Sequence, residues 1–256
     1  MRDDLTQDEL KPFNLQLFQP LKGYRYSLDA LLLASFCTEL KSEGRIIDLG
    51  AGCGIISLVL ARTNRLASVV AVEKNPEMAT LAERNILHND LAERVSVTES
   101  DVLGLRRIFP DSSFDLVVSN PPFRKSGSGK ISPRAGRDSA RHESTAGLAD
   151  FIATAKYLVK PSGKICFIQL PSRLSEFMVL AGQLKLSLLR LRLVHSNAES
   201  EATMFMAEMA KGRRSLPLVE MPLFVRDMEG EYTDEVAEML GMQRKKTSQV
   251  SKTWEV

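Results

Sequence analysis

The chain has 256 residues and a formal net charge of +2, with 44% hydrophobic and 26% charged residues; this excludes a disordered or low-complexity chain and allows one α/β domain of about seven strands. Its cysteines, Cys37, Cys53 and Cys166, form no Cys-x-x-Cys pair, so we expect reduced thiols, a cytoplasmic protein and no metal site. The longest apolar run, Leu28–Cys37, contains Asp29 and is too short to span a membrane.

The N-terminal segment, residues 1–44, begins with acidic residues and ends in an apolar helix. Ser27 is placed to cap this helix. Asp29 falls in its first turn, and an acid in an apolar helix needs a polar partner. We therefore expect the helix to pack on the rest of the chain and to close one side of a binding pocket.

Strands followed by helices occupy residues 45–212. Arg45–Leu49 is an apolar run that ends in glycines and leads into an apolar helix, Ile55–Arg62, as a parallel strand leads into its crossover helix. Asn75 and Pro76 are typical of the cap and first turn of another helix. The further predicted strands are Ala67–Glu73, Arg94–Thr98, Phe114–Ser119, Lys164–Leu170, Leu188–His195 and Ala202–Met209.

The last two of these strands are too close in sequence for a crossover helix, so they must be antiparallel. Two more helices are expected, one over Thr145–Leu158 and one that begins at the cap Ser172. The sequence thus predicts an α/β, Rossmann-like fold with a seven-stranded, mostly parallel sheet, one antiparallel strand and helices on both faces. Residues 213–256 form a C-terminal extension, with a short strand at Leu223–Val225, a helix at Thr233–Leu240 and a disordered basic end.

Three polar or glycine-rich features follow successive predicted strands, and ligands bind at such strand ends. The first is a glycine cluster, Asp48-Leu-Gly50-Ala51-Gly52-Cys-Gly54. Its third glycine comes one residue too early for the dinucleotide fingerprint, which favours a cofactor without phosphate over a nicotinamide. Glu73 is placed to accept hydrogen bonds from two ribose hydroxyls, and Asp101 from an adenine amino group.

Together these features resemble the class I methyltransferases that bind S-adenosylmethionine. The resemblance covers about residues 45–210 and implies that the cofactor is S-adenosylmethionine. It implies a cofactor-binding role for the following residues: Asp48, Gly50, Ala51, Gly52, Gly54, Glu73, Lys74, Asp101 and Asn120.

A turn sequence, Asn120-Pro121-Pro122-Phe123, ends the fourth predicted strand. Two prolines stop a strand and hold the intervening carbonyl rigidly. The Asn120 side-chain oxygen and the Pro121 carbonyl can accept both hydrogens of an exocyclic amine, and Phe123 can stack on its base. The motif therefore indicates methyl transfer to a nitrogen, by direct in-line displacement.

This turn resembles motif IV of amino-methyltransferases, Asn/Asp-Pro-Pro-aromatic. That group includes adenine-N6, guanine-N2 and protein-glutamine methyltransferases, so the motif indicates the nitrogen chemistry without choosing a substrate. A protein-glutamine or rRNA guanine-N2 methyltransferase stays open here. A non-catalytic RNA-binding protein of the same fold is the other alternative, which the intact Glu73, Asp101 and Asn120 disfavour.

A longer block resembles the bacterial family that methylates adenine N6 of the base 3′ of the anticodon in valine tRNA. It reads Phe18-Gln-Pro, then Gly23-Tyr-Arg-Tyr-Ser-Leu-Asp-Ala-Leu-Leu-Leu-Ala, and the match continues through Asn120–Phe123, Ala140-Arg-His-Glu and Pro222-Leu-Phe-Val. The resemblance implies a tRNA substrate and places Ser27 and Asp29 beside the cofactor.

A basic stretch, residues 124–141, follows the proline turn directly and is rich in glycine and serine, which predicts a flexible loop. Its cations are predicted to bind RNA phosphates: Arg124, Lys125, Lys130, Arg134, Arg137 and Arg141. We expect tRNA as the macromolecular partner, no membrane or metal partner, and a monomer.

Overall fold

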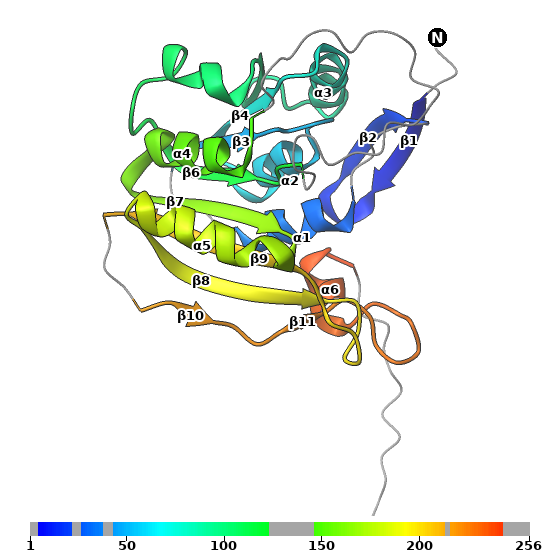
Figure 1. The fold of residues 1–256 in the computed structure, drawn as a ribbon. Helices are drawn as coiled ribbons and strands as arrows, with labels where there is room; N and C mark the ends of the chain where they lie inside the picture. The colour runs from blue at the N-terminus through cyan, green and yellow to red at the C-terminus, as the bar shows by residue number, and fades with distance from the viewer. Residues whose placement is uncertain (1–4, 22–26, 38–42, 123–145, 213–215, 243–256) are drawn as a thin grey trace, which may run out of the picture.

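The computed structural model describes residues 5–21, 27–37, 43–122, 146–212 and 216–242. Within these ranges, seven strands of the central sheet lie in the order β8-β9-β7-β6-β3-β4-β5 (Figure 1). Their bounds are β3 Arg45–Leu49, β4 Ser68–Glu73, β5 Val95–Glu99, β6 Phe114–Ser119, β7 Val159–Gln169, β8 Leu186–His195 and β9 Ala202–Lys211. Strand β9 is antiparallel to both neighbours and the other pairings are parallel, so the mostly parallel sheet with one antiparallel strand is confirmed. In the described part of the chain, two further short strands bring the sheet to nine strands instead of the predicted seven.

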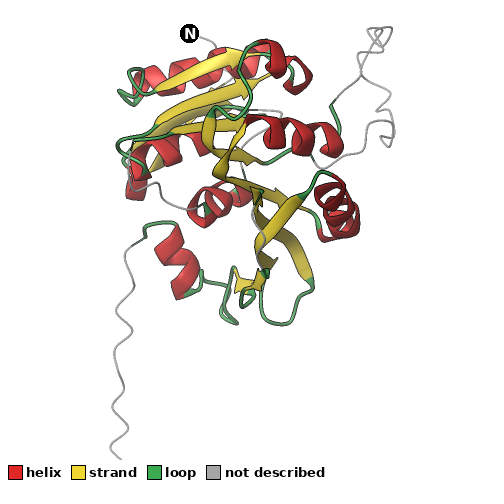
Figure 2. Cartoon of the chain, turned by 90° about the vertical axis from the view of Figure 1, so that its left-hand side faces the viewer, coloured by secondary structure: helices red, strands yellow, loops and turns green. Residues whose placement is uncertain are grey.

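Helices cover both faces of this sheet (Figure 2). Strand β3 shows why both faces need a cover. Its consecutive residues Ile46 and Ile47 point to opposite faces, and each is fully buried in a different core cluster. Ile46 packs with the apolar residues of α1 and α2, whereas Ile47 packs with those of α4 and α5. The helices are α1 Leu28–Phe36, α2 Ile55–Thr63, α3 Pro76–His88, α4 Leu148–Leu158, α5 Leu174–Gln183 and α6 Asp234–Met239.

The predicted start of α5 at Ser172 is wrong. Pro171–Arg173 first form a 3-10 turn, η3, and α5 begins at Leu174 after Arg173. Pro171 holds its φ near the helical value, so the chain is already turning when it reaches Ser172. By contrast, Asn75 caps α3 as predicted, and its side chain accepts from the Glu77 N–H at 2.9 Å.

An N-terminal hairpin was not predicted. Its strands, β1 (Leu5–Leu10) and β2 (Leu15–Pro20), are antiparallel and joined by the 3-10 turn η1 (Lys11–Phe13). Leu15 and Leu17 on β2 are 1% and 0% exposed and belong to the same core cluster as α1 and α2. The hairpin is therefore an integral part of the fold.

The C-terminal extension also joins this cluster. Its short strands, β10 (Leu218–Val219) and β11 (Leu223–Phe224), both pair in parallel with β8. Leu223, Val236 and Leu240 are buried in the cluster, and the Ser35 hydroxyl of α1 donates to the Met239 carbonyl at the end of α6 at 2.7 Å. The C-terminal extension therefore packs against α1 and helps to hold it in place.

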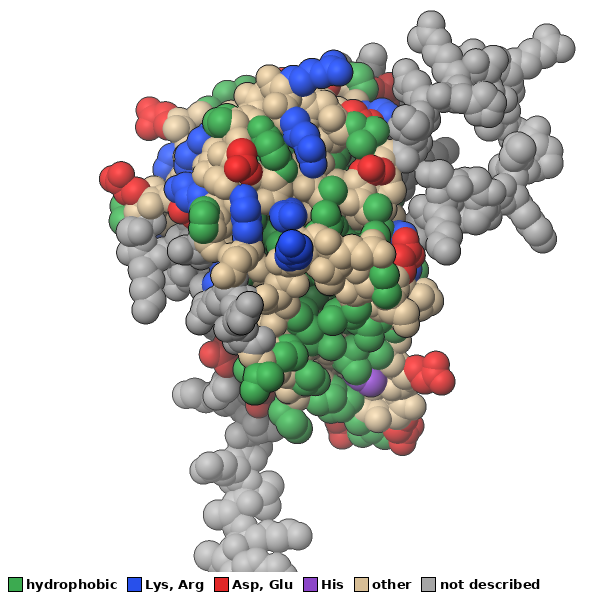
Figure 3. Space-filling model, turned by 60° about the vertical axis from the view of Figure 1, so that its left-hand side comes forward, with side chains coloured by type: hydrophobic (Ala, Val, Ile, Leu, Met, Phe, Trp, Pro, Cys, Tyr) green, Lys and Arg blue, Asp and Glu red, His purple; other side chains and the backbone are tan. Residues whose placement is uncertain are grey.

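One face of the molecule separates apolar from basic side chains (Figure 3). Figure 3 shows hydrophobic side chains gathered on the lower half of one face and Lys and Arg side chains on the upper half. Exposed apolar residues include Val179 on α5 and Met221 in the C-terminal extension. Within the described ranges, no helix has the length and apolarity needed to cross a membrane.

Candidate active site

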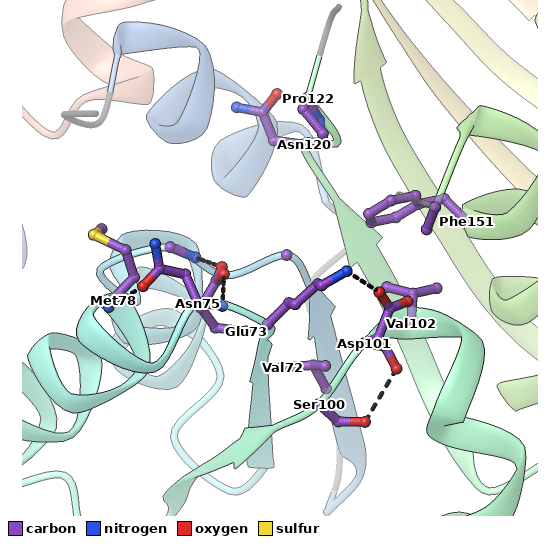
Figure 4. A pocket seen from close by; sticks show the side chains of 14 residues that line it. Val72, Glu73, Asn75, Met78, Ser100, Asp101, Val102, Asn120, Pro122 and Phe151 are labelled. Carbon is purple, nitrogen blue, oxygen red and sulfur yellow. Dashed lines mark hydrogen bonds and ion pairs between the residues drawn. The ribbon is translucent and has the colours of Figure 1, made fainter. Parts of the chain in front are cut away.

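A pocket of about 280 Å³ lies at the carboxyl ends of β3, β4, β5 and β6. Seven of its lining residues are site residues predicted from the sequence: Gly50, Gly52, Glu73, Lys74, Asp101, Asn120 and Pro122. Figure 4 shows Asn120 and Pro122 at the end of β6, Glu73 at the end of β4 and Asp101 just beyond β5. Parallel strands thus bring together residues that are far apart in sequence.

The glycine loop wraps the end of β3 with three residues at positive φ. Gly50, Gly52 and Gly54 have φ of 78°, 57° and 86°, which residues other than glycine rarely adopt. The amides of Gly50 and Ala51 both donate to the Val72 carbonyl of β4, at 2.9 and 2.8 Å. Ala51 and Gly54 are buried in this loop and do not line the pocket.

Glu73 is held by two backbone amides. Its Oε2 accepts from the Gly52 N–H and its Oε1 from the Asn75 N–H, each at 2.8 Å. A carboxylate oxygen can accept more than one hydrogen bond, so both oxygens keep capacity for a ligand. The side chain is therefore fixed in place and still able to bind a pair of hydroxyl groups.

Asp101 makes an ion pair that the sequence did not predict. The Lys74 Nζ lies 2.8 Å from Asp101 Oδ2, and the Leu103 N–H donates to Oδ1 at 2.9 Å. Partial burial alone would raise the pKa of Asp101, but the Lys74 and Leu103 hydrogen bonds outweigh it and lower that pKa below its usual value. Asp101 is thus an ionised acceptor, and Lys74 neutralises it at the pocket wall.

Asp48 lies at the end of β3, beneath the glycine loop, and does not line the pocket. It is fully buried, and its Oδ2 accepts from the Ser57 hydroxyl of α2 at 2.8 Å. Its Oδ1 has no hydrogen-bond partner among the described residues. Burial raises the pKa of Asp48 to about 7, and the hydrogen bond from Ser57 only partly opposes this rise.

The two predicted residues at the start of α1 also lie outside the pocket lining. The Ser27 hydroxyl does not cap the helix backbone. It donates to Asp29 Oδ2 at 2.9 Å, which supplies the polar partner expected for this acid. Phe123 and the six basic residues predicted to bind RNA lie outside the described residues.

At the end of β6, the backbone is anchored to the neighbouring strand. The hydroxyl of Ser119, the last residue of β6, donates to the Leu49 carbonyl of β3 at 2.8 Å. Pro121 is buried, while Asn120 is half-buried and Pro122 exposed toward the pocket. The anchor and the prolines fix the site at which Asn120 presents its amide.

Seven pocket residues were missed by the sequence analysis: Val72, Asn75, Met78, Ser100, Val102, Ala146 and Phe151. Asn75 and Ser100 flank predicted acids, which is a signal that could have found them. Phe151, on α4, points into the pocket (Figure 4). A Cβ on Gly50 would meet the Phe151 ring at 3.5 Å. In the sequence it is indistinguishable from a core residue of an amphipathic helix.

The residues that line the pocket fit S-adenosylmethionine better than a dinucleotide. Glu73 and Asp101 supply acceptors for hydroxyl and amino groups, and Val102 and Phe151 give the pocket apolar walls. Among the described lining residues, Lys74 is the single cation, and it is paired with Asp101. Among these described residues, a pyrophosphate would find no cation that is not already paired.

Solved structures share this fold. A predicted O-methyltransferase of Agrobacterium tumefaciens superposes with a TM-score of 0.65 at 24% identity, over 86% of this chain and 99% of that one. The tRNA m1G37 methyltransferase of M. jannaschii does so with a TM-score of 0.58 at 17% identity, over 84% and 59%. The strand order and these likenesses define a class I methyltransferase fold.

Sequence comparisons are more specific. The family model of the methyltransferase small domain matches residues 28–184. The tRNA1(Val) (adenine(37)-N6)-methyltransferase of Porphyromonas gingivalis is 32% identical over 190 residues, 72% of this chain and 73% of the relative. That of Tolumonas auensis is 34% identical over 152 residues, 59% and 61% of the two chains. The chain therefore belongs to the methyltransferase small domain family, among the tRNA1(Val) (adenine(37)-N6)-methyltransferases.

Proposed function

We propose that this chain methylates N6 of an adenine in tRNA, with S-adenosylmethionine as the methyl donor. The observation that carries the proposal is the position of Asn120, at the end of β6 in the same pocket as Glu73 and Asp101. The names of the relatives support adenine 37 of a valine tRNA as the target. A tRNA substrate also favours a cytoplasmic location.

Glu73 and Asp101 would hold the donor. In this proposal the two oxygens of Glu73 accept from the ribose hydroxyls and Asp101 accepts from the adenine amino group, with Val102 and Phe151 as apolar walls of the pocket. Ser27, Asp29 and Asp48 belong to this proposal as residues that stabilise the donor from outside the pocket lining. When bound, the donor supplies an electrophilic sulfonium methyl group.

Asn120 would act on the target amine. Its Oδ1 and the Pro121 carbonyl accept the two amine hydrogens, which orients the nitrogen lone pair toward the methyl group. These acceptors stabilise the positive charge that develops on the nitrogen as its bond to the methyl carbon forms and the carbon–sulfur bond breaks. The methylated nitrogen is then acidic enough to give its extra proton to water, so no strong general base is required. Phe123 is proposed to stack on the base.

The RNA would bind outside the pocket through cations. Arg124, Lys125, Lys130, Arg134, Arg137 and Arg141 follow the proline turn in the sequence. Neutralising phosphates with such residues gives salt-dependent affinity. We propose that one copy of the chain is sufficient for binding and catalysis.

The test is methyl transfer to separate pools of tRNA, rRNA and protein from cells that lack the gene. Labelled S-adenosylmethionine is added with the purified protein, and the products are digested and separated. We expect label in tRNA as N6-methyladenosine. Label in N2-methylguanosine of rRNA, or in methylglutamine of protein, would contradict the proposed substrate.

A further inference from the structure

Asn85 of α3 is completely buried and uses its side-chain amide in three hydrogen bonds. Its Oδ1 accepts from the Phe18 N–H at 2.8 Å, and its Nδ2 donates to the Phe18 carbonyl at 3.0 Å. Nδ2 also donates to the Cys53 carbonyl at 2.9 Å. One side chain thus joins the N-terminal hairpin to the glycine loop.

Asn89, one helical turn later, holds the same strand in the same way. Its Oδ1 accepts from the Gln16 N–H at 2.8 Å and its Nδ2 donates to the Gln16 carbonyl at 2.7 Å. Its third hydrogen bond goes to the Asn85 carbonyl within α3, at 2.7 Å, and not to the glycine loop. The two asparagines therefore differ in one contact.

This arrangement follows from matching repeats. Residues i and i+4 of a helix lie about 6 Å apart along its axis, and alternate residues of a strand lie about 6.7 Å apart. Asn85 and Asn89 can therefore pair with Phe18 and Gln16 on the edge of β2 that β1 leaves open. The two side chains serve as a substitute strand for the hairpin.

The contact to Cys53 matters because of its neighbours. Gly52 precedes it and donates its amide to Glu73, and Gly54 follows it at φ of 86°. Peptides between glycines rotate with little steric resistance. The bond from Asn85 holds the Cys53–Gly54 peptide, which limits the rotation left to the neighbouring Gly52, whose amide donates to Glu73.

We propose that Asn85 is a positioning residue for the methyl donor, through which the N-terminal hairpin becomes part of the cofactor site. This inference rests on the proposed function. Asn85 touches no pocket space itself and acts through Cys53 and Gly52.

The test compares Asn85→Ala with Asn89→Ala. Each variant loses two hydrogen bonds to β2 and one further bond, so similar falls in Tm are expected. Isothermal titration with S-adenosylhomocysteine should show Kd raised about tenfold in Asn85→Ala, the loss expected for one net hydrogen bond, and nearly unchanged in Asn89→Ala. Amide exchange of the peptide over residues 50–55 should quicken in Asn85→Ala alone.

Kinetics give a second readout. Asn85→Ala should raise KM for S-adenosylmethionine and leave kcat at saturating donor close to that of the wild type. Equal effects of the two variants on Kd would overturn the inference, because the hairpin alone would then explain them. If Asn85→Ala does not fold, Asn85→Asp keeps the acceptor for the Phe18 N–H, and an unchanged Kd in that variant would equally overturn it. A wild-type protein that does not bind S-adenosylhomocysteine would instead contradict the proposed function.

Discussion

The Gly52 amide donates to Glu73 Oε2 at 2.8 Å, so the glycine loop and the acid at the end of the next strand are already joined within the protein. The second oxygen of Glu73 accepts from the Asn75 N–H at the start of α3. Three elements are thus fixed around one carboxylate. A ligand that binds there does not have to order them first, which lowers the entropy lost on binding.

Glu73→Gln should weaken donor binding strongly. The amide nitrogen of glutamine cannot accept a hydrogen bond, so either Gly52 or Asn75 loses its acceptor and one ribose hydroxyl loses its partner. We expect Kd for S-adenosylhomocysteine to rise by about 10- to 100-fold. Glu99→Gln is the control, since Glu99 is exposed and lies directly opposite Glu73 in the β4–β5 register. A similar loss in both variants would contradict this role.

Asp48→Asn should stabilise the protein at high pH. The pKa of Asp48 rises from 3.8 to about 7 on folding, mainly by burial. The folded state therefore retains a proton that the unfolded chain releases, and the free energy of unfolding falls as pH rises through this window and levels off above it. Asparagine does not titrate, so the variant avoids this loss of stability, which amounts to roughly 4 kcal/mol at most. Tm of the variant should exceed that of the wild type more at pH 8 than at pH 5.

Asp115→Asn is the control of opposite sign. Partial burial alone would raise the pKa of Asp115, but the hydrogen bonds from Lys160 and the Arg45 amide outweigh burial, so the pKa is lowered. The ionised form is therefore favoured by folding, and its contribution to stability is present above the unfolded pKa and lost as pH falls. This variant should lower Tm at pH 8. A gain in Tm at pH 8 for both variants would show that charge removal, and not the burial of Asp48, is responsible.

Asn120→Ala should lower the rate of methylation strongly and affect donor binding much less. The substitution removes one of the two acceptors proposed for the target amine but none of the hydrogen bonds that fix Glu73. Loss of an acceptor of this kind typically lowers kcat by about 10²- to 10³-fold. Single-turnover rates and the Kd of S-adenosylhomocysteine separate the two effects. Asn120→Asp, which retains an acceptor oxygen, should recover part of the rate.

Neutralising the basic stretch after the proline turn should weaken tRNA binding. Replacing Arg134, Arg137 and Arg141 with glutamine removes three charges near the active-site motif in sequence. The slope of log K against log salt should become shallower by about two to three units. Replacing Arg244, Lys245 and Lys246 changes the net charge equally and should have a smaller effect. Binding that does not depend on salt would contradict an RNA substrate.

The sheet could be predicted because each of its central strands carries a strong local signal. The run Arg45–Leu49 carries apolar residues on both faces, and Asn75-Pro76 marks the start of α3 in the way that capping requires. The hairpin was missed because its buried residues, Leu15 and Leu17, alternate with glutamines over too short a stretch to outweigh the acidic residues before it. Strand β10 has only two residues and carries no periodicity to detect.

Polar site residues could be predicted from strand ends, but their partners could not. Nothing in the sequence shows that Lys74 pairs with Asp101, because that contact depends on how two neighbouring strand ends approach each other. Phe151 was missed for a related reason. Its apolar side chain in an amphipathic helix fits the core equally well, and only the path of α4 past Gly50 brings it to the pocket.

The burial of Leu15 and Leu17 limits how this protein can be shortened. The family model begins at Leu28, after the hairpin, and ends at Leu184, before β8 and β9. A recombinant fragment cut at those positions would expose the apolar sides of α2 and α3 and the amides of Asn85 and Asn89. It would also leave β7 as an open edge able to pair with other chains. The boundaries of the family signature are therefore not boundaries of a folding unit, and such a fragment should aggregate when expressed.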